Sequence, residues 1–126
     1  MDLPTKQGRI QIGGKQLDVV CTKFGTTLFI FISEFQKIGT LLEVTADAVL
    51  HQPHSKFIFS VKTLLGKDDD LTHTIGRSIA GHITEQMRQP GRILLALGLK
   101  TNPDPSTLSQ ILTKLDSFSV WSELSS

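Results

Sequence analysis

The residues in this sequence that could most readily do chemistry are four histidines and one cysteine. His51 and His54 are three positions apart and flank Pro53, whereas His73 and His82 are nine positions apart in a segment with helical periodicity. Because each residue turns an α-helix by about 100°, the spacing places the second pair on opposite helix faces. No cysteine pair lies near the first pair. We therefore expect solvated histidines and no metal site.

Cys21 is the remaining candidate for a reactive group. It lies between Val20 and Thr22 in an alternating segment typical of a strand, with no helix N-terminus nearby to activate its thiol. We expect a buried structural thiol. The sequence has no Gly-x-Ser-x-Gly turn, and a strand rather than a helix is predicted after Gly13 and Gly14. These patterns predict no enzyme and no cofactor.

A charged run at 67–70, formed by Lys67, Asp68, Asp69 and Asp70, stands directly before a predicted helix. Contiguous acids lack the alternating spacing of a calcium-binding loop. Carboxylates are favoured at a helix N-terminus, because its free N–H groups and the helix dipole carry partial positive charge. The run therefore predicts a helix cap.

The overall charge argues against a nucleic-acid partner. Thirteen basic residues against twelve acidic ones leave a net charge of +1, and the chain has no tyrosine and one tryptophan. Proteins that grip nucleic acid usually carry a clear basic excess and aromatic stacking platforms. We expect no such partner.

Membrane and secretory signals are also missing from the pattern. The longest apolar runs, at 28–32 and 93–97, are far shorter than the roughly 18 residues of a transmembrane helix. The polar start lacks the apolar block of a signal peptide, and a single cysteine fits a reducing compartment. We expect a cytosolic or nuclear protein without a membrane partner.

The elements that position these residues follow from apolar periodicity. Alternating or β-branched segments between glycine turns predict strands, the first two joined by a hairpin at Gly13 and Gly14. Apolar residues at steps of four predict a helix over 70–88, and a second helix is predicted over 105–117 behind an Asp104–Pro105 cap. We expect strands near 9–12, 17–21, 28–32, 40–44, 57–65 and 92–99, and a loop with one helical turn over 45–55.

This order predicts an α+β fold: an antiparallel sheet of about six strands with two helices on one face. We expect a single domain over 1–126, in which 121–126 form a loose tail. The runs at 28–32 and 93–97 are apolar on both faces, and two helices cover only one face of such a sheet. We expect a dimer partner to cover the second face. One of the two faces of the 28–32 strand lies in that interface, either Leu28, Ile30 and Ile32 or Phe29 and Phe31, and the sequence leaves both open.

A succession of short segments carries a resemblance to a known family. These are VVCTKF at 19–24, FQKIGTL at 35–41, VKTLLGKD at 61–68, RILLA at 92–96 and VW at 120–121. In their order and spacing, over roughly residues 10–121, the chain resembles the proteasome assembly chaperone 3 family.

The resemblance implies a non-enzymatic chaperone that assists assembly of the proteasome core-particle α-ring. Members of the family pair sheet to sheet with a related small chaperone, proteasome assembly chaperone 4, or with themselves, and bind proteasome α subunits. We expect the 67–70 run to contact an α subunit, with helix capping alone as the other interpretation. The alternative function is a small homodimeric α+β scaffold that binds a GTPase or a membrane complex.

Overall fold

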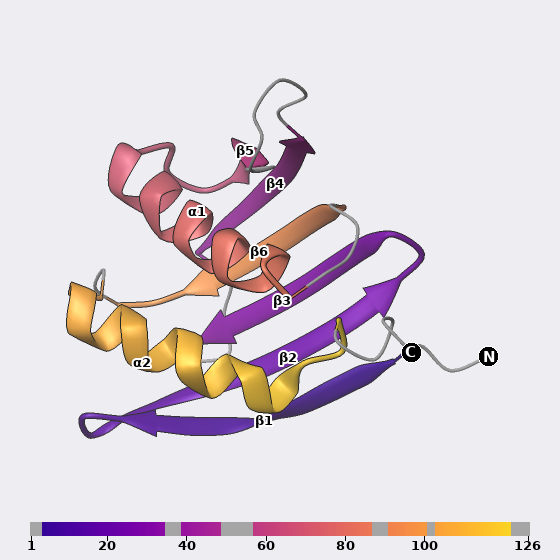
Figure 1. Ribbon diagram of the computed structural model, residues 1–126. Coiled ribbons are helices and arrows are strands. Elements are labelled where there is room, and N and C mark those ends of the chain that lie inside the picture. The colour runs from indigo at the N-terminus through magenta and orange to yellow at the C-terminus, as the bar shows by residue number, and fades with distance from the viewer. Residues whose placement is uncertain (1–3, 35–38, 49–56, 87–90, 101–102, 122–126) are drawn as a thin grey trace.

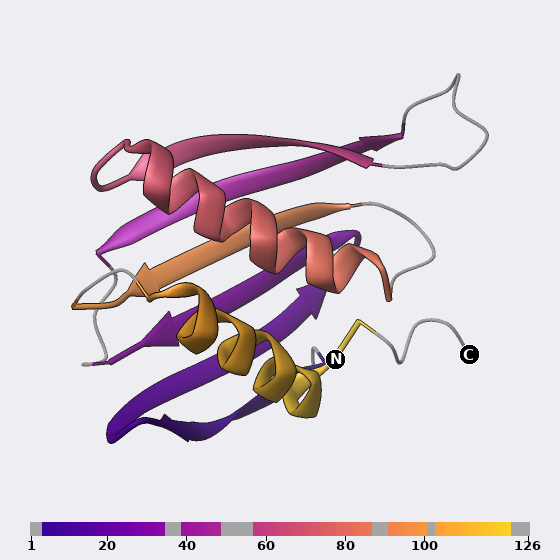
Figure 2. The same cartoon turned by 60° about the vertical axis from the view of Figure 1, so that its left-hand side comes forward.

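The computed structural model describes residues 4–34, 39–48, 57–86, 91–100 and 103–121. In chain order, the elements are β1 (Thr5–Ile12), β2 (Lys15–Phe24), β3 (Thr27–Ser33), β4 (Thr40–Ala48), β5 (Phe57–Leu65), α1 (Asp70–Thr84), β6 (Arg92–Gly98), α2 (Pro105–Leu115) and a 3-10 turn, η1 (Asp116–Phe118). Both helices lie on the same side of one sheet (Figures 1 and 2). The α+β prediction is confirmed.

The sheet has the strand order β1-β2-β3-β6-β4-β5 and is mixed (Figure 1). Every neighbouring pair is antiparallel except β3 and β6, which are parallel. The expectation of a wholly antiparallel sheet is therefore wrong at this pair. The α1 crossover connects β5 to β6 and makes these two strands parallel. β3 runs in the same direction as β5, because β4 lies between them in the chain and is antiparallel to β5. β3 and β6 are therefore parallel.

The ends of several elements also differ from those expected. β4 runs to Ala48, where a loop and a helical turn were expected, because its second half pairs with the start of β5. The two helices end at Thr84 and Leu115, before the predicted 88 and 117, and η1 continues the second one. Trp121, expected to begin a loose tail, is buried. The rest of that predicted tail, 122–126, lies outside the described residues.

Both helices begin at the predicted aspartate caps. The Asp69 carboxylate accepts a hydrogen bond from the Thr72 N–H at 2.7 Å, and the Asp104 carboxylate accepts one from the Thr107 N–H at 2.7 Å. Pro105 occupies the first turn of α2, where its missing N–H costs nothing. The helix starts are therefore local properties of the sequence.

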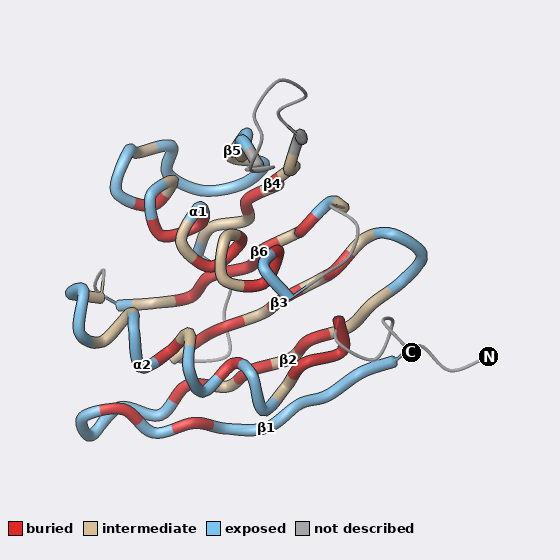
Figure 3. The backbone as a smooth tube through the Cα atoms, in the orientation of Figure 1, coloured by how far each residue is buried: buried red, intermediate tan, exposed pale blue. Residues whose placement is uncertain are grey.

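The core lies between the helices and the sheet. α1 packs over β4 and β5, and α2 packs over β1. Buried positions concentrate along β2, β3 and β6, whereas most of β1 is exposed (Figure 3). On β3, the side chains of Leu28, Ile30 and Ile32 are at most 1% exposed and belong to this core. The face of β3 that carries these three residues is therefore the face beneath the helices.

Candidate functional site

Cys21 has the surroundings of a structural thiol. Its side chain is fully buried in β2, and burial raises the pKa of the thiol to about 12. At neutral pH almost no thiolate forms, and the thiolate is the nucleophilic species. The predicted burial of this cysteine is confirmed.

A threonine, a histidine and an aspartate meet at the start of α1. His73 Nε2 lies 2.9 Å from Thr63 Oγ1 and 2.7 Å from Asp68 Oδ1, and the Thr63 hydroxyl donates to Asp68 Oδ1 at 3.0 Å. In a nucleophilic triad, the hydroxyl and the carboxylate bind opposite ring nitrogens of the histidine. Here both share Nε2, so no proton relay exists. The cluster instead ties the end of β5 to the first turns of α1.

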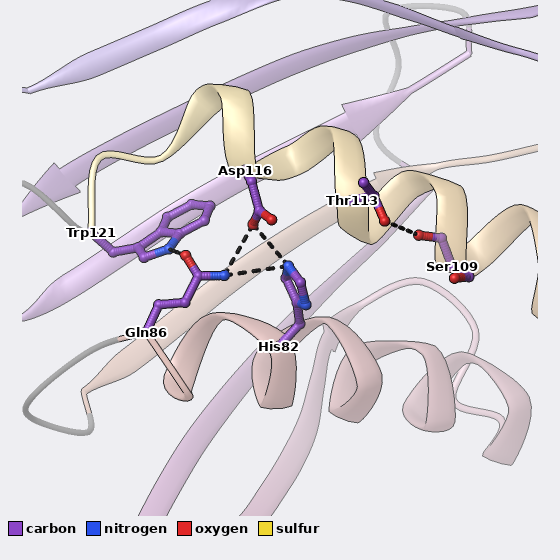
Figure 4. Close-up of polar contacts among 6 residues, drawn as sticks. All are labelled: His82, Gln86, Ser109, Thr113, Asp116 and Trp121. Carbon is purple, nitrogen blue, oxygen red and sulfur yellow. Dashed lines mark hydrogen bonds and ion pairs between the residues drawn. The ribbon is translucent and has the colours of Figure 1, made fainter.

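The other helical histidine joins the end of α1 to the C-terminal segment (Figure 4). His82 Nε2 lies 2.8 Å from Asp116 Oδ1, and the Gln86 amide donates to the same oxygen at 3.0 Å. The Trp121 indole N–H donates to Gln86 Oε1 at 3.0 Å. Desolvation alone would raise the pKa of Asp116, but the hydrogen bonds from Gln86 and His82 outweigh it and hold the pKa below its usual value. This network is structural.

Among the described residues, no group of three or more histidines, cysteines and carboxylates could hold a metal ion. His73 faces β5 and His82 faces η1, as their predicted opposite positions on the helix require. His51 and His54 lie outside the described residues. In the same part of the chain, no helix is long and apolar enough to cross a membrane.

The 67–70 run forms part of an exposed corner between β5 and α1. Asp69 caps the helix, and Asp68 belongs to the Thr63–His73 cluster. The side chains of Lys67 and Asp70 are exposed and make no hydrogen bond or ion pair with another described residue. Asp70 lies in the first turn of α1, where the helix dipole favours a carboxylate, and the charge of Lys67 helps to lower the pKa of Asp69. These two side chains are therefore the members of the run with the weakest structural contacts.

Three exposed leucines flank this run, and the sequence pattern did not predict their exposure. Leu64 and Leu65 end β5 and are 44% and 59% exposed, and Leu71 in the first turn of α1 is 53% exposed. The apolar steps of four that predict this helix begin with Leu71, but the buried position in this turn is Thr72. We call the leucines together with residues 67–70 the β5–α1 corner. It combines apolar surface with a net charge of −2, from three aspartates and one lysine.

The second candidate surface is the face of the sheet that neither helix covers, which we call the open sheet face. Phe29 and Phe31 lie on it, because the alternate side chains of β3 are buried beneath the helices. Directly opposed residues on neighbouring strands share a face: Val20 lies opposite Phe31, and Leu94 and Ala96 lie opposite Phe29 and Phe31. An apolar band therefore crosses the centre of the open sheet face.

Ion pairs flank this band on both sides. Arg9 Nε lies 2.8 Å from Asp18 Oδ1 on the β1–β2 side, and Arg92 Nη1 lies 3.1 Å from Glu43 Oε2 on the β6–β4 side. Near the first pair, the surface has a shallow hollow whose lining includes Val20. An apolar centre with a polar rim is the usual anatomy of a protein–protein interface.

Comparison with known proteins agrees with this architecture. The fold is similar to that of a chain in the crystal structure of a novel chaperone complex for yeast 20S proteasome assembly, with a TM-score of 0.63 and 19% sequence identity over 93% of this chain and 98% of the other. The chain is 29% identical over 98 residues to proteasome assembly chaperone 3 of Bos taurus (78% of this chain, 79% of the relative), and 28% identical over 96 residues to that of Homo sapiens (76% and 77%).

A further relative has a longer match. Proteasome assembly chaperone 3 of Nematostella vectensis is 29% identical over 119 residues, which cover 89% of this chain and 86% of the relative. The family model described as proteasome assembly chaperone 3 matches residues 30–118, a span that runs from β3 through η1. The chain belongs to the proteasome assembly chaperone 3 family, whose members are assembly factors and not enzymes.

Proposed function

We propose that this chain assists assembly of the α-ring of the 20S proteasome, and that it acts as one half of a dimer formed through the open sheet face. Family membership supports the assembly role. The observation that carries the dimer is the band of Val20, Phe29, Phe31 and Leu94, which the helices leave uncovered. Monomeric proteins rarely expose contiguous apolar patches larger than a few hundred Å².

The second sheet comes from a related small chaperone of the proteasome assembly chaperone 4 type, or from a second copy of this chain. A sheet packed about 10 Å away would bury the phenylalanines at the centre of the interface. The ion pairs Arg9–Asp18 and Arg92–Glu43 are satisfied within the chain. They leave the rim of the face close to neutral, so both partners are compatible with its charge. The test is the mass of the complex in solution, with the chain alone and co-expressed with the related chaperone.

The β5–α1 corner is our proposed contact for a proteasome α subunit. It offers apolar side chains, Leu64, Leu65 and Leu71, beside acidic ones, and this combination suits a basic surface with apolar patches. The corner lies at one end of the sheet and helix layer, apart from the centre of the open sheet face (Figure 1). A dimer and an α subunit could therefore be held at the same time. A contact of this limited size would also allow later release.

The assembly role itself is tested with purified components. Recombinant α subunits are mixed with the chain and its partner, and the yield of assembled rings is measured against mixtures without them. Higher ring yield with the chaperone supports the proposal, and unchanged yield contradicts it. No feature of the described residues favours the alternative of a scaffold for a GTPase or a membrane complex. We propose a cytosolic or nuclear location, with which an unpaired buried cysteine is compatible.

A further inference from the structure

A small pocket on the helix side of the sheet shares no lining residue with either surface described above. It is formed where the β1–β2 hairpin and the end of β3 meet the first turn of α2. Leu17, Leu99 and Ile111 contribute apolar walls, and Leu17 and Ile111 are almost fully buried. Because Leu17 belongs to the face of β2 beneath the helices, a partner on the open sheet face would leave the pocket accessible.

The size of the pocket limits what it can hold. Its volume is about 160 Å³. Pockets for cofactors and drug-sized ligands usually measure about 300–1,000 Å³. A cavity of about 150 Å³ accommodates one benzene ring. The pocket is therefore too small for a cofactor and matches a single side chain.

The charges in the pocket favour a cation. The Glu34 side chain is only 8% exposed, and its Oε1 lies 3.7 Å from Lys15 Nζ. Charge-assisted hydrogen bonds between such groups are about 2.7–2.9 Å long, so this ion pair is loose. The Asp104 carboxylate also lines the pocket. Among the described lining residues, two carboxylates and one ammonium give a net charge of −1.

The positive charge of Lys15 acts on Asp104 as well as on Glu34. Hydrogen bonds from Thr107 hold the pKa of Asp104 below its usual value, and the positive charge of Lys15 lowers this pKa further. An anion would gain little from the helix N-terminus, because Asp104 already accepts the Thr107 N–H and Pro105 has no N–H to offer. The site is therefore suited to a positively charged group with an apolar stem.

We propose that this pocket binds an arginine side chain presented by a protein partner. The guanidinium would form a two-point contact with Glu34, and its methylene groups would lie against Leu17, Leu99 and Ile111. Arginine fits better than lysine, because its planar fork matches a carboxylate and it is less strongly hydrated than an ammonium. The Lys15 side chain is half exposed, and the guanidinium would compete with its ammonium for the Glu34 carboxylate. This proposal does not depend on the proteasome role.

The test uses two small probes and amide NMR spectra of the full chain. N-acetyl-arginine-N-methylamide is compared with its citrulline counterpart, which has nearly the same shape but no charge. We expect saturable shifts at the amides of Leu17, Leu99 and Thr107 with the arginine probe at millimolar concentration. The citrulline probe should bind at least about tenfold more weakly, because it loses the charge-assisted contact. Equal binding of both probes, or no saturable shift below about 100 mM, would overturn the proposal.

Two variants and a control locate the binding. Glu34→Gln should weaken arginine binding about tenfold, because the shape of the side chain stays and only the charge is lost. Thr107→Leu should also weaken binding by narrowing the pocket, and it keeps the proposal testable if the first variant does not fold. Glu85→Gln removes an exposed carboxylate elsewhere on the chain and should leave binding unchanged. Wild-type affinity in a folded Glu34→Gln or Thr107→Leu variant would show that arginine does not bind in this pocket. An equal loss of affinity in the Glu85→Gln control would show the same.

Discussion

The two faces of β3 make the sharpest prediction, because adjacent residues should respond in opposite ways to the same substitution. Ile30 is fully buried and lies opposite Cys21 and Leu95, both of which are also fully buried. Ile30→Lys loses about 1.5–3 kcal/mol of apolar burial and adds several kcal/mol for a buried unpaired ammonium. Domains of this kind are stable by only about 5–15 kcal/mol. The variant should therefore be unfolded or insoluble.

Phe31→Lys places the same charge on the open sheet face. There the lysine stem can lie along the apolar band while the ammonium reaches water, so the single chain should stay folded. In a dimer, the same ammonium is enclosed between two sheets at a cost of at least about 2 kcal/mol, which weakens association about 30-fold or more. Phe31→Leu is the matched control, because it keeps an apolar side chain and should keep the dimer.

Circular dichroism of the three variants measures whether they fold, and sedimentation measures whether they dimerise. Folded, dissociated Phe31→Lys beside unfolded Ile30→Lys is the expected pair of results. If both lysine variants are folded dimers, neither face is buried as argued. If instead Ile30→Lys gives folded monomers and Phe31→Lys unfolds, the dimer forms through the face of Ile30 and the helices cover the face of Phe31. A wild-type chain that is monomeric both alone and with the related chaperone would exclude the dimer itself.

Three further predictions concern the corner, the C-terminal network and the cysteine. Lys67→Ser combined with Asp70→Ser should weaken α-subunit binding in a pull-down and lower the melting temperature less than Asp69→Ala does, because Asp69 provides the hydrogen-bonding cap of α1. Unchanged affinity of the double variant would limit the run to a role at the helix start. The lowered pKa of Asp116 means that its contribution to stability is complete above the usual value of 3.8 and is lost as the pH falls through the native pKa. Acid unfolding of Asp116→Asn should therefore lack this component, and identical acid profiles would contradict the argument. Cys21 should resist alkylation at pH 8 until the protein unfolds, because its pKa of about 12 leaves about one thiol in ten thousand ionised. Rapid labelling of the native protein would show that the thiol is not buried.

The features that could be predicted from the sequence depend on neighbouring residues. Asp69 and Asp104 cap helices because a carboxylate can reach the free N–H groups one turn ahead. Gly13 and Gly14 form the hairpin turn with φ angles of 55° and 82°, which glycine adopts without strain. The alternation along β3 separated two sets of side chains, and the limited area of two helices indicated that one set would stay uncovered. None of these inferences needs the rest of the fold.

Only the tertiary structure decided which set of β3 side chains the helices cover and where each strand lies in the sheet. β6 is inserted between β3 and β4 because α1 returns the chain across the sheet, a choice that no local pattern encodes. Leu71 follows the apolar period of α1 and yet is exposed, since burial depends on what lies opposite a side chain and not on its own type. The pocket at Glu34 joins residues more than 70 positions apart in the chain, from the β1–β2 hairpin to α2. Contacts over such distances arise from packing of the whole fold, so they have no counterpart in the periodicity of any one segment.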